Sequence, residues 1–170
     1  MKQRFFYCPV CGHKLIQKFL HEKERLVCSV CNRIHYENPI VGVAAILLNE
    51  QRQVLLVKRA RNVSYPGLWC IPCGYLEYDE EIRDGMVREV YEETGLVVEA
   101  SEVFAVHSNF HDENQHTVGI WFLTKNIKGN IQAGDDAAEV AWFNPLEVPP
   151  LAFPTDQIVL ADLAKKLRIN

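Results

Sequence analysis

The sequence predicts a protein of mixed α/β structure, preceded by a small cysteine-rich module. Three observations predict this fold class. Apolar segments of strand length recur between residues 41 and 143, separated by polar loops. Residues 80–94 have apolar side chains at helical spacing. Four of the six cysteines lie within the first 38 residues, where aliphatic residues are few.

The chain is long enough for one α/β domain with a proper core and one small module that needs additional stabilisation. The Asn38-Pro39 step precedes the first strongly apolar run, and proline favours an extended connection at such a point. We therefore expect two domains, residues 1–38 and residues 39–170.

Strands and helices are predicted along the second domain in mixed order. Residues 41–48 and 53–58 resemble a hairpin closed by a polar turn. The other predicted strands are residues 68–71, 102–109, 117–124 and 139–143. The helix at 80–94 has Asp79 as a possible N-cap and Gly95 at the C-cap. A last helix after residues 154–156 is expected to bury Ile158, Val159, Leu163 and Leu167.

Composition limits the classes of partner. The net charge of −4 and the pI near 5.9 argue against a general binder of nucleic acid or of membrane surfaces, which are polyanionic. The longest apolar run, residues 39–48, is half of the roughly 20 residues that a membrane-spanning helix needs. The first residues lead directly into a cysteine motif without a targeting segment. We expect a cytoplasmic protein with reduced thiols.

Two C-x2-C pairs, Cys8 with Cys11 and Cys28 with Cys31, are separated by 16 residues, which is typical of a zinc ribbon. Four thiolates would complete a tetrahedral Zn²⁺ site, so the metal would be structural. Disulfides or free thiols are the alternatives, and the reducing compartment disfavours disulfides. Lysines and an arginine between the pairs alternate with Glu22 and Glu24, so no stripe for tracking phosphates is evident.

Glu89, Glu92 and Glu93 are spaced to place three carboxylates on one face of the predicted helix. Their mutual repulsion would be relieved by Mg²⁺ or Mn²⁺, which prefer oxygen ligands. A solvated helix face is the alternative for an isolated triplet of glutamates. Here Gly74 precedes the helix, and glycine allows the backbone to approach a bound metal closely.

Residues 74–96, GYLEYDEEIRDGMVREVYEETGL, resemble the Nudix box, G-x5-E-x7-R-E-U-x-E-E-x-G-U with U aliphatic, at every specified position. The resemblance implies a Nudix-type α/β/α sandwich with a mixed sheet over about residues 40–165. It implies that Glu89, Glu92, Glu93 and the Gly74 carbonyl hold Mg²⁺ or Mn²⁺. Arg88 would orient the glutamates, and Glu80 would support the loop or a further metal.

The activity implied by the resemblance is hydrolysis of a pyrophosphate bond in a nucleoside-diphosphate compound, releasing a nucleoside monophosphate such as AMP. A ribbon followed by this box resembles the NADH, FAD and ADP-ribose pyrophosphatases. Residues 151–155 match only part of the SQPWPFPxS array of the NADH enzymes. The general base stays open among the box glutamates, Asp112, Glu113 and Glu139. Family members are often homodimers.

Several side chains could contact a small nucleotide substrate. Trp69, Tyr75 and Phe110 could stack on a base, with a core position as the alternative. Arg59, together with Lys58 and Arg61, could meet phosphates, although a solvated strand end predicts the same residues. The histidines at 107, 111 and 116 flank one polar loop and have surface positions as their alternative.

The sequence leaves alternatives open for the third cysteine pair and for the function of the whole chain. Cys70 and Cys73 form a third C-x2-C pair that could be a redox or metal motif. An extended strand would turn these two thiols to opposite sides, which disfavours that role. For the whole chain, the alternatives are a nucleotide-derivative sensor without catalysis, an RNA 5′-end pyrophosphohydrolase, and a prenyl-diphosphate isomerase.

Overall fold

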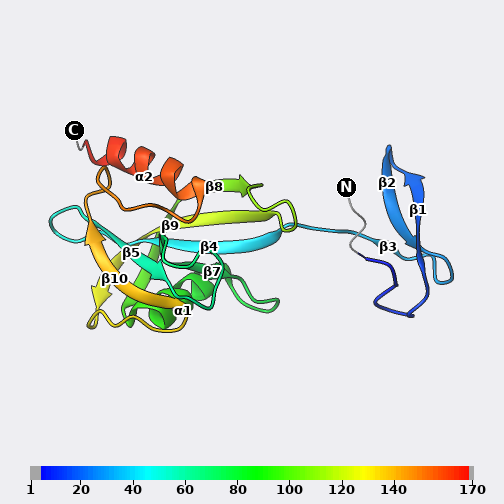
Figure 1. The fold of residues 1–170 in the computed structure, drawn as a ribbon, viewed down its shortest axis with the longest axis horizontal. Helices are drawn as coiled ribbons and strands as arrows, with labels where there is room; N and C mark the ends of the chain where they lie inside the picture. The colour runs from blue at the N-terminus through cyan, green and yellow to red at the C-terminus, as the bar shows by residue number, and fades with distance from the viewer. Residues whose placement is uncertain (1–4, 169–170) are drawn as a thin grey trace. The chain divides into compact units, whose positions relative to one another are not determined.

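The structure, a computed structural model, describes residues 5–168. It divides the chain into two compact units, Met1–Asn38 and Pro39–Asn170 (Figure 1). No helix among the described residues is both long enough and apolar enough to cross a membrane.

The first unit is a three-stranded antiparallel sheet. Its strands are β1 (Leu15–Leu20), β2 (Lys23–Cys28) and β3 (Ile34–His35), in the order β1-β2-β3. The buried residues Cys8, Leu15 and Cys28 form its small core. Because two of these three residues are cysteines, the unit has little apolar burial with which to offset chain entropy.

The second unit contains two sheets and two helices. The four-stranded sheet has the order β7-β4-β9-β8, and the three-stranded sheet has the order β10-β5-β6. The strands are β4 (Ile40–Ile46), β5 (Val54–Arg59), β6 (Trp69–Cys70), β7 (Cys73–Tyr75), β8 (Val97–Asn109), β9 (Thr117–Lys128) and β10 (Ala137–Phe143). The β4–β9 pair is parallel and the other pairs are antiparallel, which confirms the predicted α/β fold with a mixed sheet.

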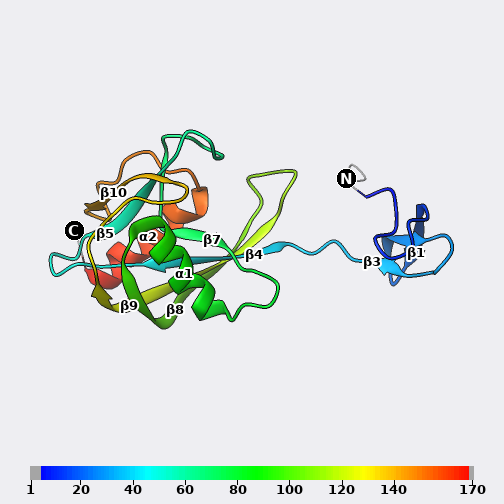
Figure 2. The same cartoon turned by 90° about the horizontal axis from the view of Figure 1, so that it is seen from below.

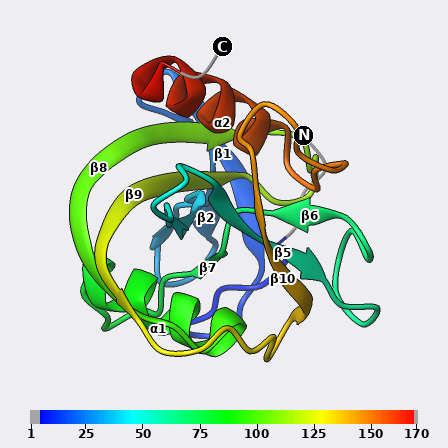
Figure 3. The same cartoon turned by 90° about the vertical axis from the view of Figure 1, so that its left-hand side faces the viewer.

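Strand β4 is buried on both faces, and successive residues enter different cores because side chains alternate along a strand. The helices α1 (Ile82–Thr94) and α2 (Pro154–Leu167) cover opposite faces, as Figures 2 and 3 show. The α1 core includes Val43, Ala45, Met86 and Val90, and the α2 core includes Ala44, Ile46, Val159 and Leu163. This arrangement is the α/β/α sandwich predicted from the sequence.

The predicted hairpin at residues 41–58 is wrong. The turn after β4 forms, with the Asn49 amide donating to the Gln53 carbonyl, and a single bridge joins Leu48 to Val54. Beyond that bridge the chain enters the other sheet, where β5 pairs with β10 and β6. A polar turn between apolar runs thus fixed the reversal of direction but not the pairing partners.

The helix termini also differ from the prediction. Helix α1 begins at Ile82, and Glu81 is the N-cap because its carboxylate accepts from the amides of Arg83 and Asp84. Gly95 ends the helix in the left-handed conformation, as predicted. Helix α2 begins earlier than expected, with Pro154 in its first turn. Ile158 is 49% exposed rather than buried.

Candidate functional site

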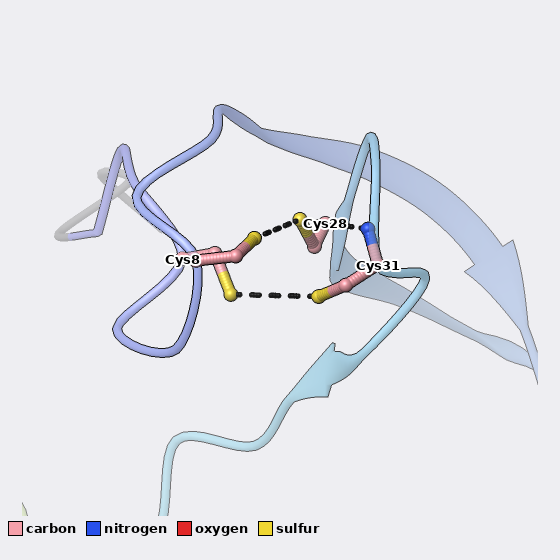
Figure 4. A group of neighbouring side chains, drawn as sticks. Cys8, Cys28 and Cys31 are labelled. Atoms are coloured by element: carbon pink, nitrogen blue, oxygen red, sulfur yellow. Dashed lines mark hydrogen bonds between the residues drawn. The ribbon is translucent and has the colours of Figure 1, made fainter.

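The four cysteines of the first unit converge on one point, which Figure 4 shows for Cys8, Cys28 and Cys31. The Sγ atoms all lie within 4.8 Å of one another, with Cys8 3.8 Å from Cys31 and Cys11 3.3 Å from Cys28. Zn–S bonds of about 2.3 Å in a tetrahedron require sulfur separations of roughly 3.8 Å. The sulfur set therefore fits a tetrahedral metal site with no ligand position left open.

The backbone of each C-x2-C pair is shaped for metal binding. Gly12 and Asn32, which follow the second cysteine of each pair, have φ of 70° and 57°, a conformation that glycine and asparagine adopt most easily. The amide of Cys31 donates to Cys28 Sγ over 3.4 Å. Backbone amides of Val30 and Cys31 lower the pKa of Cys28 to about 6. The turn thus favours the thiolate, the form that binds metal.

In the second unit, Arg88 of α1 ties the acidic residues of the box together. Its guanidinium pairs through Nε and Nη2 with the two oxygens of Glu80, at 2.8 and 2.9 Å. Nη1 donates to Glu89 Oε1 at 2.7 Å and to Glu92 Oε2 at 2.9 Å. The hydrogen bonds from Arg88 also lower the pKa of Glu80. One arginine therefore compensates three carboxylates and fixes where they point.

Glu89 packs so closely against Gly74 that any side chain there would displace the Glu89 carboxylate. A Cβ at Gly74 would lie 2.0 to 2.2 Å from the Glu89 carboxylate atoms. A similar contact exists at Gly85, where a Cβ would lie 2.7 Å from Glu80 Oε2. A side chain at either glycine would therefore displace a box carboxylate from its present position, and the Gly74 backbone is adjacent to Glu89, a predicted metal ligand.

Glu93 is the most buried carboxylate of the box, with 3% of its surface exposed. Its Oε2 accepts from the Cys73 amide at 2.9 Å. Burial raises the pKa of Glu93 to about 8, and burial also raises the pKa of Glu89. A cation beside these two groups would lower both pKa values, because a nearby positive charge favours the ionised form. This donor set fits a hard divalent ion.

The carboxylates are not closed around a point as the thiols are. Within residues 5–168, the four cysteines are the only group of three or more His, Cys, Asp or Glu residues whose ligand atoms all lie within 4.8 Å of one another. Glu89 and Glu92 are instead held by Arg88, and Glu93 is held by a backbone amide. A cation would therefore share these carboxylates with groups that already position them.

A cavity of about 470 Å³ opens beside Gly74, within the size range of small-molecule sites. Cys73, Gly74 and Tyr75 of β7 line one side of it, and Gly42 to Ala44 of β4 line another. Segments distant in sequence supply the rest, namely Arg59, Ser64, Tyr65, Asn109, His111, Asp112, Gln115, Thr117, Gly119, Trp121, Asp136, Phe153, Thr155 and Asp156. The acidic helix thus has a cleft next to it.

Three aromatic rings from three loops gather at this cavity. The Tyr65 and His111 centroids are 5.6 Å apart, and each lies 5.7 Å from that of Phe153. The Arg59 guanidinium lies 5.4 Å from the Phe153 centroid, and its Nε donates to the Ser64 carbonyl. Together they form an aromatic, partly cationic wall of the cavity.

Buried polar groups of α2 form another part of the cavity lining. Asp156 accepts from the Ile71 amide at 3.0 Å and from Trp121 Nε1 at 3.2 Å. Burial raises the pKa of Asp156 to about 7. Next to it, the buried Thr155 Oγ1 has no hydrogen-bond partner among the described residues. A buried hydroxyl without a partner is costly, and a ligand in the cavity could satisfy it.

The predicted substrate contacts fall into two groups. Arg59 and Tyr75 line the cavity, and the Tyr75 hydroxyl accepts from Gln115 Nε2 at 2.6 Å. Trp69 and Phe110 do not line it. Trp69 is a buried core residue that packs on Phe143, with ring centroids 4.9 Å apart. Phe110 is 65% exposed and contacts His116.

The remaining candidates divide in the same way. Asp112 and His111 line the cavity, whereas Glu113, His107, His116 and Arg61 do not. Glu139 forms an ion pair with Lys58 at 3.2 Å, and both side chains are substantially exposed. Of the candidate bases outside the box, Asp112 alone therefore faces the cavity.

Cys70 and Cys73 do not lie in one extended strand, contrary to the expectation from the sequence that placed their thiols on opposite sides. The chain passes from one sheet to the other at Ile71 and Pro72, between β6 and β7. Cys70 ends β6 and Cys73 begins β7, so the two residues do not lie in one continuous strand, and interaction with Cys70 followed by burial raises the pKa of Cys73. The expected opposite orientation holds only within a continuous strand. The raised pKa disfavours the thiolate that redox chemistry needs.

No sequence motif identifies several of the residues that line the cavity. Tyr65, Gln115, Trp121, Asp136 and Asp156 belong to no local motif. Phe153 lies in the segment that partly matches the SQPWPFPxS array, and this is the one sequence feature that pointed to any of the missed residues.

Two known protein families match this chain. The family described as the NUDIX domain matches residues 38–163, and the family described as Nudix N-terminal matches residues 7–37. The chain therefore belongs to the Nudix family of hydrolases, with the family's N-terminal cysteine module in front.

Relatives agree with this assignment. An ADP-ribose pyrophosphatase of Methanocaldococcus jannaschii is 34% identical over 125 residues, covering 73% of each chain. An NAD-capped RNA hydrolase, NudC, of Vibrio parahaemolyticus is 28% identical over 95% of this chain, which spans 59% of that relative. A NUDIX hydrolase structure from Nitrosomonas europaea has a TM-score of 0.83 at 30% identity, covering 98% of this chain and 94% of that one.

Proposed function

We propose that the chain hydrolyses the pyrophosphate bond of an ADP-linked compound of the ADP-ribose, FAD or NADH class and releases AMP. The observation that carries the proposal is that Glu89 lies against Gly74 and Glu93 accepts from the Cys73 amide, while Cys73 and Gly74 both line the aromatic-walled cavity. The ADP-ribose pyrophosphatase relative supports the same substrate class.

We assign Mg²⁺ or Mn²⁺ to Glu89, Glu92, Glu93 and the Gly74 carbonyl, and Zn²⁺ to the four thiols. A divalent ion bound to a diphosphate supplies charge neutralisation and lowers the pKa of a bound water. The burial that raises the pKa of Glu93 supports the assignment, because a cation beside this carboxylate would favour its ionised form. The zinc would be structural, since four thiolates leave no open coordination position.

The chain's own groups would position the substrate. Arg59 is the cavity cation available to a diphosphate, while Tyr65, His111 and Phe153 offer faces on which adenine can stack. The unpaired Thr155 hydroxyl offers a hydrogen bond to a polar edge of the ligand. The base that takes the proton of the attacking water remains open between a box glutamate and Asp112.

A second candidate substrate is an RNA that carries NAD at its 5′ end. It is favoured by the relative named as an NAD-capped RNA hydrolase, because that alignment covers 95% of the chain and includes the ribbon. The bond cut would be the same pyrophosphate, so one site could serve both substrates.

The test is a substrate panel with Mn²⁺ or Mg²⁺ and chromatographic identification of products. ADP-ribose, FAD, NADH, a diadenosine polyphosphate and a 5′-triphosphate RNA are compared at equal concentration. AMP released from ADP-ribose or a dinucleotide, and abolished by EDTA, is the expected result. Hydrolysis confined to the triphosphate RNA, or turnover that persists in EDTA, would contradict the proposal.

A further inference from the structure

Positive charge is concentrated in the ribbon. Residues 1–38 contain seven Lys and Arg against three Asp and Glu, whereas residues 39–170 contain eleven against nineteen. The net charge of −4 for the whole chain therefore conceals a first unit of opposite sign. A small basic module on an acidic enzyme indicates a separate contact with an anion.

The strand register separates charges that alternate in the sequence. In the antiparallel β1–β2 pair, Lys18 lies opposite Arg25 and Leu20 lies opposite Lys23. Opposed residues project from the same face, and alternate residues along a strand share a face. Lys18, Lys23 and Arg25 therefore project together. Glu24 lies opposite Phe19 and projects from the other face.

The basic side also presents an aromatic ring. Tyr36 is 56% exposed, and the Arg25 guanidinium lies 5.4 Å from its ring centroid. Ile16 lies two residues before Lys18 on the same face and is 41% exposed. Within residues 5–168, none of Lys18, Lys23 and Arg25 takes part in an ion pair with a carboxylate. We call Ile16, Lys18, Lys23, Arg25 and Tyr36 the basic ribbon face.

We propose that the basic ribbon face binds single-stranded RNA and so selects substrates whose pyrophosphate lies at an RNA 5′ end. Three cations on adjacent strands match backbone phosphates, and an exposed aromatic offers a stacking surface for an unpaired base. A lipid surface or an acidic peptide would use the cations but has no base for Tyr36. The proposal deepens the second candidate substrate, and strand binding can be measured apart from hydrolysis.

The experiment uses the full-length, zinc-loaded protein and a 3′-fluorescein, uncapped 12-nucleotide RNA, followed by fluorescence anisotropy. The triple variant K18Q/K23Q/R25Q is compared with K125Q/K165Q/K166Q, which removes the same charge from exposed positions of the second unit. Zinc content per chain verifies that the ribbon remains folded in each variant.

We expect the ribbon variant to bind the RNA at least about tenfold more weakly in 0.1 M salt. The slope of log K against log salt should fall by about 2, since each lost phosphate contact contributes about 0.7 for a single strand. The variant Tyr36→Leu, which keeps an apolar group, should weaken binding by about fivefold or more. The control triple variant should bind as the unmodified protein does.

Equal weakening by both triple variants would overturn the proposal, because net charge rather than this face would then govern binding. So would an absence of RNA binding at 0.05 M salt, or binding of the unmodified protein to phosphatidylserine vesicles but not to RNA. Hydrolysis of ADP-ribose by the ribbon variant is followed in parallel. If the unmodified protein binds the RNA but does not hydrolyse ADP-ribose, the proposed activity is refuted and the ribbon proposal stands.

Discussion

The two ligand sets differ in how the chain assembles them. Four thiols reach one point from two tight turns, and the sulfur atoms already lie at metal-site separations. The carboxylates of α1 come from successive turns of one helix and do not meet at one point, and Arg88 and the Cys73 amide hold them in place. The thiols would surround a proposed Zn²⁺ completely and leave no coordination position open. The second set keeps its carboxylates ordered at the edge of a cavity, as an enzyme that must also admit a substrate requires.

Substitution of Glu93 by Gln should have the largest effect of those proposed. It removes a ligand charge with almost no change in volume, and the Gln carbonyl can still accept from the Cys73 amide. We expect ADP-ribose hydrolysis to fall on the order of 100-fold or more, roughly 3 kcal/mol in transition-state free energy.

The matched control for Glu93→Gln is Glu99→Gln, which alters an exposed glutamate paired with Lys125 at 3.8 Å. Its turnover should stay within about twofold, because exposed ion pairs contribute little. Unchanged turnover in Glu93→Gln, with the fold intact by circular dichroism, would remove Glu93 from the site.

Because four thiolates would fill every position around the zinc, loss of one cysteine should abolish zinc binding. We expect Cys28→Ser to lose its zinc and to unfold the first unit, whose core consists of Leu15 and two of the cysteines. Zinc is measured in purified protein, and amide exchange reports each unit separately. Cys73→Ser, which makes the same chemical change outside the cluster, should keep its zinc. Retention of zinc by Cys28→Ser would contradict the four-thiolate assignment.

Arg88→Lys tests whether the box carboxylates depend on Arg88 for their positions. A single ammonium cannot reproduce the bidentate pairing with Glu80 together with the contacts to Glu89 and Glu92. We expect turnover to fall by about 10- to 100-fold and half-saturation by Mn²⁺ to move to higher concentration. Arg83→Lys, at an exposed arginine of the same helix, is the control. Equal Mn²⁺ dependence in both variants would show that Arg88 does not position the ligands.

What the sequence could predict follows the same division between local and assembled features. The C-x2-C pairs, the glutamate spacing and the Gly95 cap depend on neighbours within one or two turns, so residue spacing fixes them. Helix α1 has the predicted apolar strip, with Met86 and Val90 fully buried. The alternation of β4 between two cores explains why its run is continuously apolar rather than amphipathic.

Features that depend on pairing partners could not be predicted. A turn at residues 49–52 looks the same whether its strands stay paired or separate into two sheets. The basic ribbon face likewise depends on the register that sets Lys18 opposite Arg25. The cavity joins strands β4, β5, β7, β8 and β9, their connecting loops and the start of α2, and no local spacing encodes that meeting.

Asp156 is such an assembled group, and its ionisation offers a test that needs no substrate. Its pKa of about 7 lies well above its usual value of 3.8 because the carboxyl is buried. Between these values the folded state holds a proton that the unfolded state has lost. This group's contribution to the free energy of unfolding is therefore fully present below pH 3.8 and is lost as pH rises toward 7.

Asp156→Asn removes that pH dependence. One of the two N–H donors, from Ile71 or Trp121, then faces the amide NH2, which costs about 1–3 kcal/mol at every pH. The free energy of unfolding of the unmodified protein should fall as pH rises from about 4.5 to 7.5, whereas that of the variant lacks this dependence. Relative to the unmodified protein, the variant should therefore become more stable by roughly 2–4 kcal/mol over this range, at about 1.4 kcal/mol for each pKa unit. Urea unfolding across this range measures the difference. Asp162→Asn, at an exposed carboxylate whose pKa Lys165 lowers, should show no such gain. A constant difference for Asp156→Asn would mean that the carboxyl is ionised throughout and that its two N–H donors outweigh its burial.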